Sequence, residues 1–196
     1  MPRKKSVKHS AQDFRTAADE IVLFLTSVSK GQTDQHISSL HNYAIIRLYR
    51  EFESLMLDAL VGGINNDTAT LSTIAGVEFP KHLTNEVCEF LITGTGYFDF
   101  KGRDGLIKIL KKFVPATHYL VVNVSKLIYR SALEQLSALR NFATHESDQS
   151  KRSALSAIGG QRIESSGAWL KREGRFQVIV DRLKALATDL ENAAPY

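Results

Sequence analysis

Three residues near the end of a predicted helix could do chemistry together: Arg140, Asn141 and His145. An arginine can hold a phosphate and stabilise the charge that develops on it during a reaction. A histidine can move a proton near neutral pH. Asn141 and His145 are four residues apart and stack on a helix. Arg140 lies five residues before His145 and is expected on nearly the same side of that helix. A permanent cation beside a titratable imidazole is the minimum set of groups for cutting RNA without a metal.

The spacing alone is not specific, because an exposed arginine followed by a histidine at a helix end gives the same pattern. In that alternative the charge of His145 favours the negative end of the helix dipole and does no chemistry. The surrounding elements are therefore needed to decide between the two interpretations.

The first half of the chain predicts two helices. One starts after Ser10, which serves as N-cap, and runs to about residue 29. The second and stronger prediction runs from about residue 36 to 60 and ends at Gly62-Gly63. Its apolar residues recur at spacings of three and four: Leu40, Tyr43, Ala44, Leu48, Phe52, Leu55 and Ala59.

The second half also favours helices. Short ones are expected between residues 68 and 115, one of them capped by Asp104, with a turn at 93–96. A long helix then runs from about residue 118 or 125 to 144, with an apolar stripe that contains Leu127, Ala132, Leu136 and Leu139, and the last spans about 175–192. Trp169 is interpreted as a packing anchor. The predicted fold class is all-α.

Composition is typical of a globular protein: of 196 residues, 43% are hydrophobic and 23% charged. We expect a single helical domain over residues 10–196, preceded by a flexible basic tail at 1–9. The net charge of +4 is compatible with a phosphate-bearing partner. A single cysteine, Cys88, excludes an intramolecular disulfide, and no apolar run approaches membrane-spanning length. The expected location is the cytoplasm, without a membrane partner.

Two long helices, the second ending in Arg-Asn-x-x-x-His, resemble the HEPN superfamily of helical bundles, which is rich in prokaryotic toxin and antiviral ribonucleases. The segment 41–53 also looks like the early helix of HEPN proteins of the RiboL-PSP type, with an aromatic residue, Tyr49, followed by an acidic one, Glu53. The resemblance implies a HEPN-like helical bundle with two long central helices. It also implies a metal-independent endoribonuclease with Arg140 and His145 as catalytic residues and Asn141 as their companion.

The resemblance further implies a homodimer in which two motifs face each other across one composite cleft. The expected partners are an RNA substrate and an antitoxin or defence-system protein, because the family acts in toxin–antitoxin pairs and antiphage defence. No cofactor is expected, and no metal, because no second ligand stands at suitable spacing from His145. One subgroup has a tyrosine two residues after the histidine, which its antitoxin modifies. This chain has Ser147 there, so that control is not available to it.

Three residues of the second helix are candidates for the cleft. Glu53 and Tyr49 are four residues apart and could reach the same groove, although Glu53 could equally serve helix pairing. Arg47 is expected on a solvated or phosphate-facing side. His41, His82 and His118 are expected to be capping or surface residues.

Two other functions remain open at this stage. The chain could be a non-catalytic HEPN module that binds RNA or a partner protein through the same groove, or a purely structural helical dimer. A titratable histidine at position 145 favours the enzyme, because a binding module has no need of one there.

Overall fold

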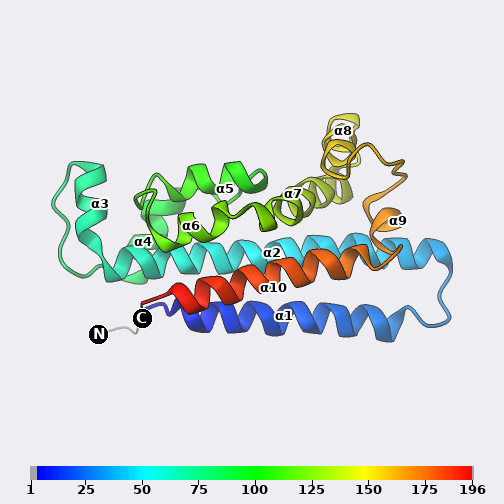
Figure 1. Cartoon of the computed structure of the whole chain (residues 1–196), viewed down its shortest axis with the longest axis horizontal. Helices are drawn as coiled ribbons and strands as arrows, with labels where there is room; N and C mark the ends of the chain where they lie inside the picture. The colour runs from blue at the N-terminus through cyan, green and yellow to red at the C-terminus, as the bar shows by residue number, and fades with distance from the viewer. Residues whose placement is uncertain (1–3, 196) are drawn as a thin grey trace.

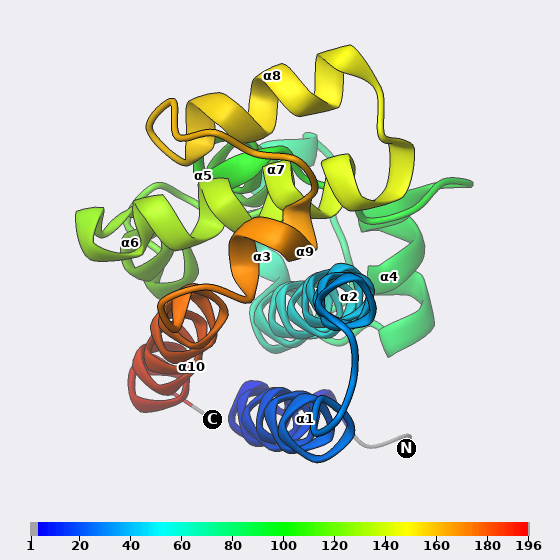
Figure 2. The same ribbon diagram turned by 90° about the vertical axis from the view of Figure 1, so that its right-hand side faces the viewer.

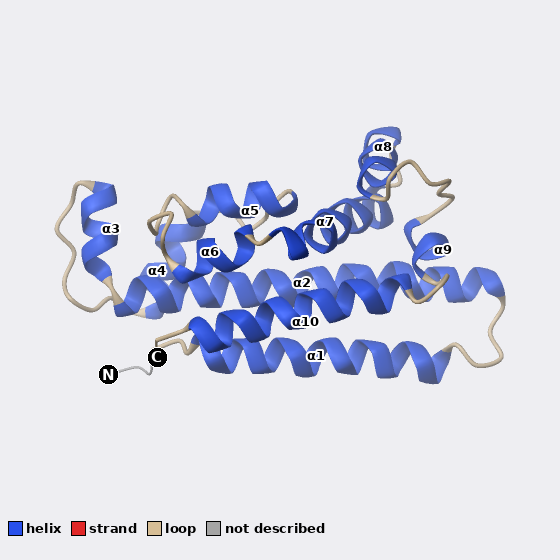
Figure 3. Cartoon of the chain, viewed as in Figure 1, coloured by secondary structure: helices blue, strands red, loops and turns tan. Residues whose placement is uncertain are grey.

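The structure is a computed structural model that describes residues 4–195. Within that range it contains helices and no strands, which confirms the all-α fold class (Figures 1 and 3). In chain order the helices are α1 (Val7–Val28), α2 (Asp34–Asn66), α3 (Thr68–Ala75), α4 (Asn85–Thr93), α5 (Gly102–Leu110), α6 (Tyr119–Ser125), a 3-10 turn (Leu127–Tyr129), α7 (Arg130–His145), α8 (Asp148–Ala157), α9 (Ser166–Leu170) and α10 (Arg175–Ala193).

The central element is α2, a helix of 33 residues. It contacts α1 on one side and α7 and α9 on the other, while α10 packs against α1 and α6. Figure 2 shows α2 between α1 below and α7 above, with α8 lying across the top of α7 and α5. Because α2 touches both layers, it is the helix that sets where the residues of α7 lie.

The predicted end of the second helix at Gly62-Gly63 is wrong, because α2 continues through both glycines to Asn66. An added Cβ at Gly62 would lie 3.0 Å from the carbonyl oxygen of Lys5, and one at Gly63 would lie 3.4 Å from the His118 ring. The glycines therefore allow neighbouring segments to approach the helix closely. Here a residue type that usually ends a helix serves packing instead.

The first helix begins earlier than predicted. Its N-cap is Ser6, whose hydroxyl accepts a hydrogen bond from the His9 amide, and Val7 is fully buried. The Lys5 ammonium lies 2.8 Å from Asp58 of α2. Residues 7–9 of the predicted tail therefore belong to α1, and Lys4 and Lys5 before them contact α2. Residues 1–3 lie outside the described part of the chain.

The predicted second central helix does not run unbroken from residue 118, whereas the alternative start near residue 125 lies close to the 3-10 turn that precedes α7. The chain turns at Lys126, where ψ is 132°, so that α6 ends before a short 3-10 turn and α7 follows. The Arg103 guanidinium donates to the Ser125 carbonyl, which has lost its helical partner. The Lys126 ammonium and the Tyr129 hydroxyl both reach Asp189 of α10, at 2.7 and 2.6 Å. Those contacts fix the start of α7 against the last helix.

One contiguous hydrophobic core joins the helices. At its centre the Phe52 ring lies edge-on to Phe14 of α1 and to Phe100, with centroids 5.6 and 5.9 Å away. Some residues of the predicted apolar stripes are exposed instead: Tyr43 is 70% exposed and Leu127 is 75% exposed. Trp169 is buried, as the packing interpretation expected. In the part of the chain that the structure describes, no helix has both the length and the apolar character needed to cross a bilayer.

A close approach between α9 and α2 provides a test of this packing. An added Cβ at Gly167 of α9 would lie 1.7 Å from the Ser38 carbonyl oxygen of α2. We expect Gly167→Ala to lower the free energy of unfolding by about 1–3 kcal/mol or more, because backbone must move to admit the methyl group. Chemical denaturation measures this change.

The matched control is Gly105→Ala in α5, where the added Cβ would meet nothing closer than 3.5 Å. That substitution should raise stability by about 0.5–1 kcal/mol, because alanine loses less backbone entropy in a helix than glycine does. Equal stability of Gly167→Ala and the wild-type protein would contradict the contact of α9 with α2.

Candidate functional site

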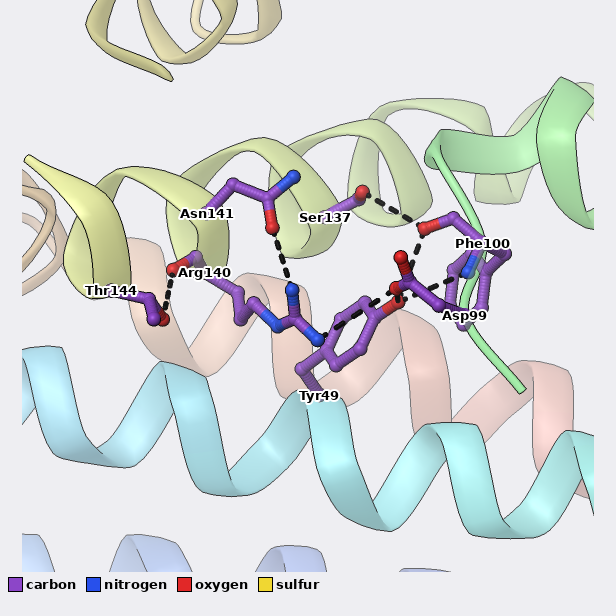
Figure 4. A network of polar contacts seen from close by, with 7 residues as sticks. All are labelled: Tyr49, Asp99, Phe100, Ser137, Arg140, Asn141 and Thr144. Carbon is purple, nitrogen blue, oxygen red and sulfur yellow. Dashed lines mark hydrogen bonds and ion pairs between the residues drawn. The ribbon is translucent and has the colours of Figure 1, made fainter. Parts of the chain in front are cut away.

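The guanidinium of Arg140 is held by residues from three different segments (Figure 4). Its central carbon lies 4.1 Å from the centroid of the Tyr49 ring of α2, the geometry of a cation–π contact. Its Nη1 donates to the Oδ1 of Asn141 at 2.7 Å, and its Nη2 lies 3.7 Å from the Oδ1 of Asp99. We call Tyr49, Asp99, Arg140 and Asn141 the Arg140 cluster.

Tyr49 is itself fixed. Its hydroxyl donates to Asp99 at 2.6 Å and accepts from the Phe100 amide at 3.3 Å, and its ring stacks on the Phe100 ring with centroids 5.0 Å apart. Burial, together with the hydrogen bond to Asp99, raises the pKa of the Tyr49 hydroxyl far above its usual range. Tyr49 is therefore a neutral donor that positions Asp99 and offers its ring face to Arg140.

Asp99 belongs to the segment between α4 and α5, and no motif or spacing in the sequence places it beside Tyr49. The only local signal is alternation: Phe98 and Phe100 are buried, and Asp99 stands between them with a half-exposed side chain. The Ser137 hydroxyl of α7 donates to the Phe100 carbonyl at 3.3 Å, which ties this segment to the helix that carries Arg140.

Glu53 follows Tyr49 by one turn of α2 and is partly buried. Burial raises the pKa of its carboxyl group, and this effect outweighs the opposing attraction of the Arg140 guanidinium. Two carboxyl groups, those of Glu53 and Asp99, thus lie in the electrostatic environment of one arginine. When both are ionised, a phosphate that approaches Arg140 must compete with them.

His145 stands apart from the cluster. It is the last residue of α7 and is exposed, and within residues 4–195 its side chain makes no hydrogen bond or ion pair. The expectation that Arg140 and His145 lie on nearly the same side of the helix is wrong, because five residues correspond to a rotation of about 140° and the two side chains leave α7 in different directions. Arg140 turns toward α2, whereas His145 turns to solvent at the helix end.

Arg47 also lies elsewhere. Its guanidinium pairs with Glu51 at 2.7 Å and lines an apolar groove of about 240 Å³ between α1 and α2, beside Phe24 and Tyr43. Among the residues predicted for the site, Arg140 therefore contacts Asn141 and Tyr49 of the same chain, and Glu53 lies near Arg140. His145 and Arg47 do not belong to this group of residues.

The end of α7 explains the residues after the motif. Glu146 adopts a left-handed conformation with φ of 47° and ends the helix. The Ser147 hydroxyl then accepts from the Ser150 amide, and the Ser150 hydroxyl accepts from the Ser147 amide, which forms a capping box for α8. Ser147 therefore has a structural role as the N-cap of α8.

His118 and His82 have the capping and surface roles expected of them, whereas His41 is partly buried and packs against another helix. His118 accepts from the Leu120 amide at the start of α6, His41 packs edge-on against Phe176, and His82 lies 3.0 Å from the Lys4 ammonium. Across residues 4–195, His, Cys, Asp and Glu side chains form no group of three or more that could hold a metal ion.

No protein-family model matches the chain, and neither the curated proteins nor the solved structures include one with significant similarity to it.

The raised pKa of Glu53 has a consequence for stability. A carboxyl group whose pKa is higher in the folded than in the unfolded protein favours folding at low pH, and this contribution is lost as pH rises through its folded pKa. Relative to wild type, Glu53→Gln should therefore gain free energy of unfolding as pH rises from below the ordinary value of 4.5 to neutrality. Denaturation at a series of pH values measures the difference.

Glu20→Gln, which removes an exposed carboxyl group of α1, is the control for the loss of one negative charge. If the stability difference between Glu53→Gln and wild type stays constant over this pH range, burial does not raise the pKa of Glu53.

Proposed function

We propose that this chain is a metal-independent endoribonuclease of HEPN type that acts as a homodimer. One observation carries the proposal: α7 holds an arginine in a fixed position and ends five residues later in an exposed, unpaired histidine. An arginine stacked on an aromatic ring and bonded to Asn141 has lost its rotational freedom before any ligand arrives, and such preorganisation is what electrostatic stabilisation of a phosphorane requires.

The proposed reaction needs only the substrate's own nucleophile. The 2′-hydroxyl oxygen of the RNA attacks the adjacent phosphorus, and the bond from phosphorus to the 5′-oxygen breaks. A histidine accepts the proton of the 2′-hydroxyl, and a second histidine donates one to the leaving 5′-oxygen. The products are a 2′,3′-cyclic phosphate and a 5′-hydroxyl, and Arg140 stabilises the charge on the phosphorane.

A dimer supplies what one chain lacks. One chain has a single His145, and this residue does not contact the Arg140 cluster. A two-fold axis near the end of α7 would bring the exposed His145 of each copy to the other copy's surface and would provide both an acid and a base. The proposed biological setting is a toxin–antitoxin pair or antiphage defence, with an antitoxin or defence-system protein as partner.

We expect His145→Ala to abolish cleavage of single-stranded RNA without changing the melting temperature, because the imidazole is exposed and makes no contact whose loss would destabilise the fold. Arg140→Ala should also abolish cleavage, but it should lower stability by about 1–2 kcal/mol, since it removes the cation–π contact and the bond to Asn141. Asn141→Ala should reduce cleavage less. The assay is gel electrophoresis of labelled RNA with excess chelator present.

Single-stranded DNA of the same sequence is the substrate control, because it lacks the 2′-hydroxyl that the mechanism uses. Products should carry 2′,3′-cyclic phosphate ends. Cleavage that survives in His145→Ala, that requires added magnesium, or that proceeds equally on DNA would refute the proposed chemistry.

The composite site makes a separate prediction. When wild-type and His145→Ala chains are mixed in equal amounts and allowed to exchange, about one quarter of two-fold dimers contain two intact histidines. We expect activity to fall to about that fraction, because acid and base come from different chains. Activity of one half, or a monomer by light scattering that still cleaves RNA, would mean that each chain acts alone.

One observation favours the second candidate, a non-catalytic module that binds RNA or a protein. The Arg140 guanidinium already has an ion partner in Asp99 and a carboxyl group nearby in Glu53, so its role could be to hold α7 on α2. RNA binding without cleavage, together with reduced stability of Arg140→Ala, would favour this candidate over the enzyme.

A further inference from the structure

An open groove of about 460 Å³ adjoins the Arg140 cluster. Its walls come from α7, from α8 and from the segment that leads into α5, in the region where Figure 2 shows α8 lying across α7 and α5. Asn141 lines this groove and also bonds to Arg140, so a ligand in the groove would lie next to the proposed catalytic arginine.

The charges along the groove favour an anion. Lys101, which precedes α5, and Arg152 of α8 both line it and both are exposed. In the described part of the chain neither has a carboxylate within ion-pair distance. The one carboxylate of the lining, Glu134, already pairs with Arg130 at 3.4 Å. The lining of the groove therefore carries two unpaired cations and one carboxylate, and that carboxylate is partly neutralised by Arg130.

Asn141 adds a donor that points away from Arg140. Because Arg140 donates to Asn141, the atom that accepts must be the amide oxygen, and this contact fixes the orientation of the side chain. The amide nitrogen then lies on the side away from Arg140, as Figure 4 shows. Its two hydrogens remain available to a ligand. The exposed hydroxyl of Ser156 lines the same groove.

We propose that this groove binds the phosphodiester backbone of the RNA strand next to the phosphate that Arg140 would engage, with Lys101 and Arg152 each contacting a phosphate. The inference deepens the proposed ribonuclease function and rests on it for the identity of the strand. A backbone ligand fits because the groove is open and offers cations and an amide donor, and its lining residues include no aromatic ring on which a base could stack.

The test measures binding, so that it does not depend on cleavage. A fluorescent single-stranded RNA of about ten nucleotides is titrated, with chelator present, into His145→Ala protein and into the same protein carrying Lys101→Ala and Arg152→Ala. Fluorescence anisotropy is recorded at several salt concentrations. The control carries Lys108→Ala and Arg182→Ala, which remove the same charge from exposed positions on α5 and α10 outside the groove.

We expect the groove variant to bind at least about tenfold more weakly than its parent, with the control within about twofold, because charged contacts are lost only in the groove variant. The slope of log affinity against log salt should shrink by about 1.4, since each lost contact to a single-stranded phosphate removes about 0.7. The side chain of Lys101 makes no capping bond to α5, so the fold should tolerate its removal, and equal melting temperatures check this.

Equal affinity and equal salt dependence in the groove variant and the control would overturn the groove proposal, and so would an absence of RNA binding by the parent protein. Cleavage by the chain with an intact His145 is assayed separately. Groove-dependent binding without cleavage would leave the groove standing and would refute the ribonuclease, so the two failures are distinguishable.

Discussion

The cation–π contact between Arg140 and Tyr49 is the interaction around which this part of the molecule is arranged. A guanidinium on the face of a partly desolvated ring gains about 0.5–2 kcal/mol, but only while the ring stays where it is. Tyr49 stays because Phe100 stacks on one face of it and because its hydroxyl bonds to Asp99 and to the Phe100 backbone. The segment before α5 thus holds the ring on which the arginine of α7 rests.

This arrangement requires tyrosine at position 49. A phenylalanine would offer the same ring to Arg140 but would remove the hydroxyl that accepts from the buried Phe100 amide and donates to Asp99. A buried polar group left without a partner, as the Phe100 amide would be, costs about 1–3 kcal/mol. The hydroxyl also brings the Asp99 carboxylate to 3.7 Å from the guanidinium. The same side chain therefore positions the cation and brings to it the carboxylate with which an anionic ligand must compete.

Helical periodicity predicted the fold class, the position of α2 and the extent of α10, because those depend on residues a few positions apart. It failed where a residue acts through a distant partner. Gly62 lies inside α2 and leaves room for the Lys5 carbonyl, which a side chain there would meet. At Lys126 the chain leaves the helical conformation, and contacts of Lys126 with Asp189 and of Arg103 with Ser125 hold the turn. Asp99 was missed for the same reason.

In the candidate site, too, the features that depend on local spacing could be predicted and those that depend on distant partners could not. The motif predicted correctly that Arg140 and Asn141 lie near the end of a helix. The spacing of four residues predicted that Tyr49 and Glu53 share one face of another helix. That Arg47 faces a different groove is a consequence of geometry, since it precedes Tyr49 by two residues and so leaves α2 about 160° away from it. Helical periodicity was therefore enough to predict that Arg47 and Tyr49 face different sides of α2. Asp99, the partner of Arg140 in the segment between α4 and α5, could be found only from the folded structure.

The spacing of the motif bears on whether one chain could form a complete site. A separation of four residues would place the arginine and the histidine about 40° apart on α7, where both could reach one ligand. Five residues place them about 140° apart, so that a helix which turns its arginine toward α2 must turn its histidine outward. An outward histidine at a helix end can reach an arginine only across an interface. Under the proposed function, the spacing that separates the two groups within a chain is therefore what makes the second copy necessary.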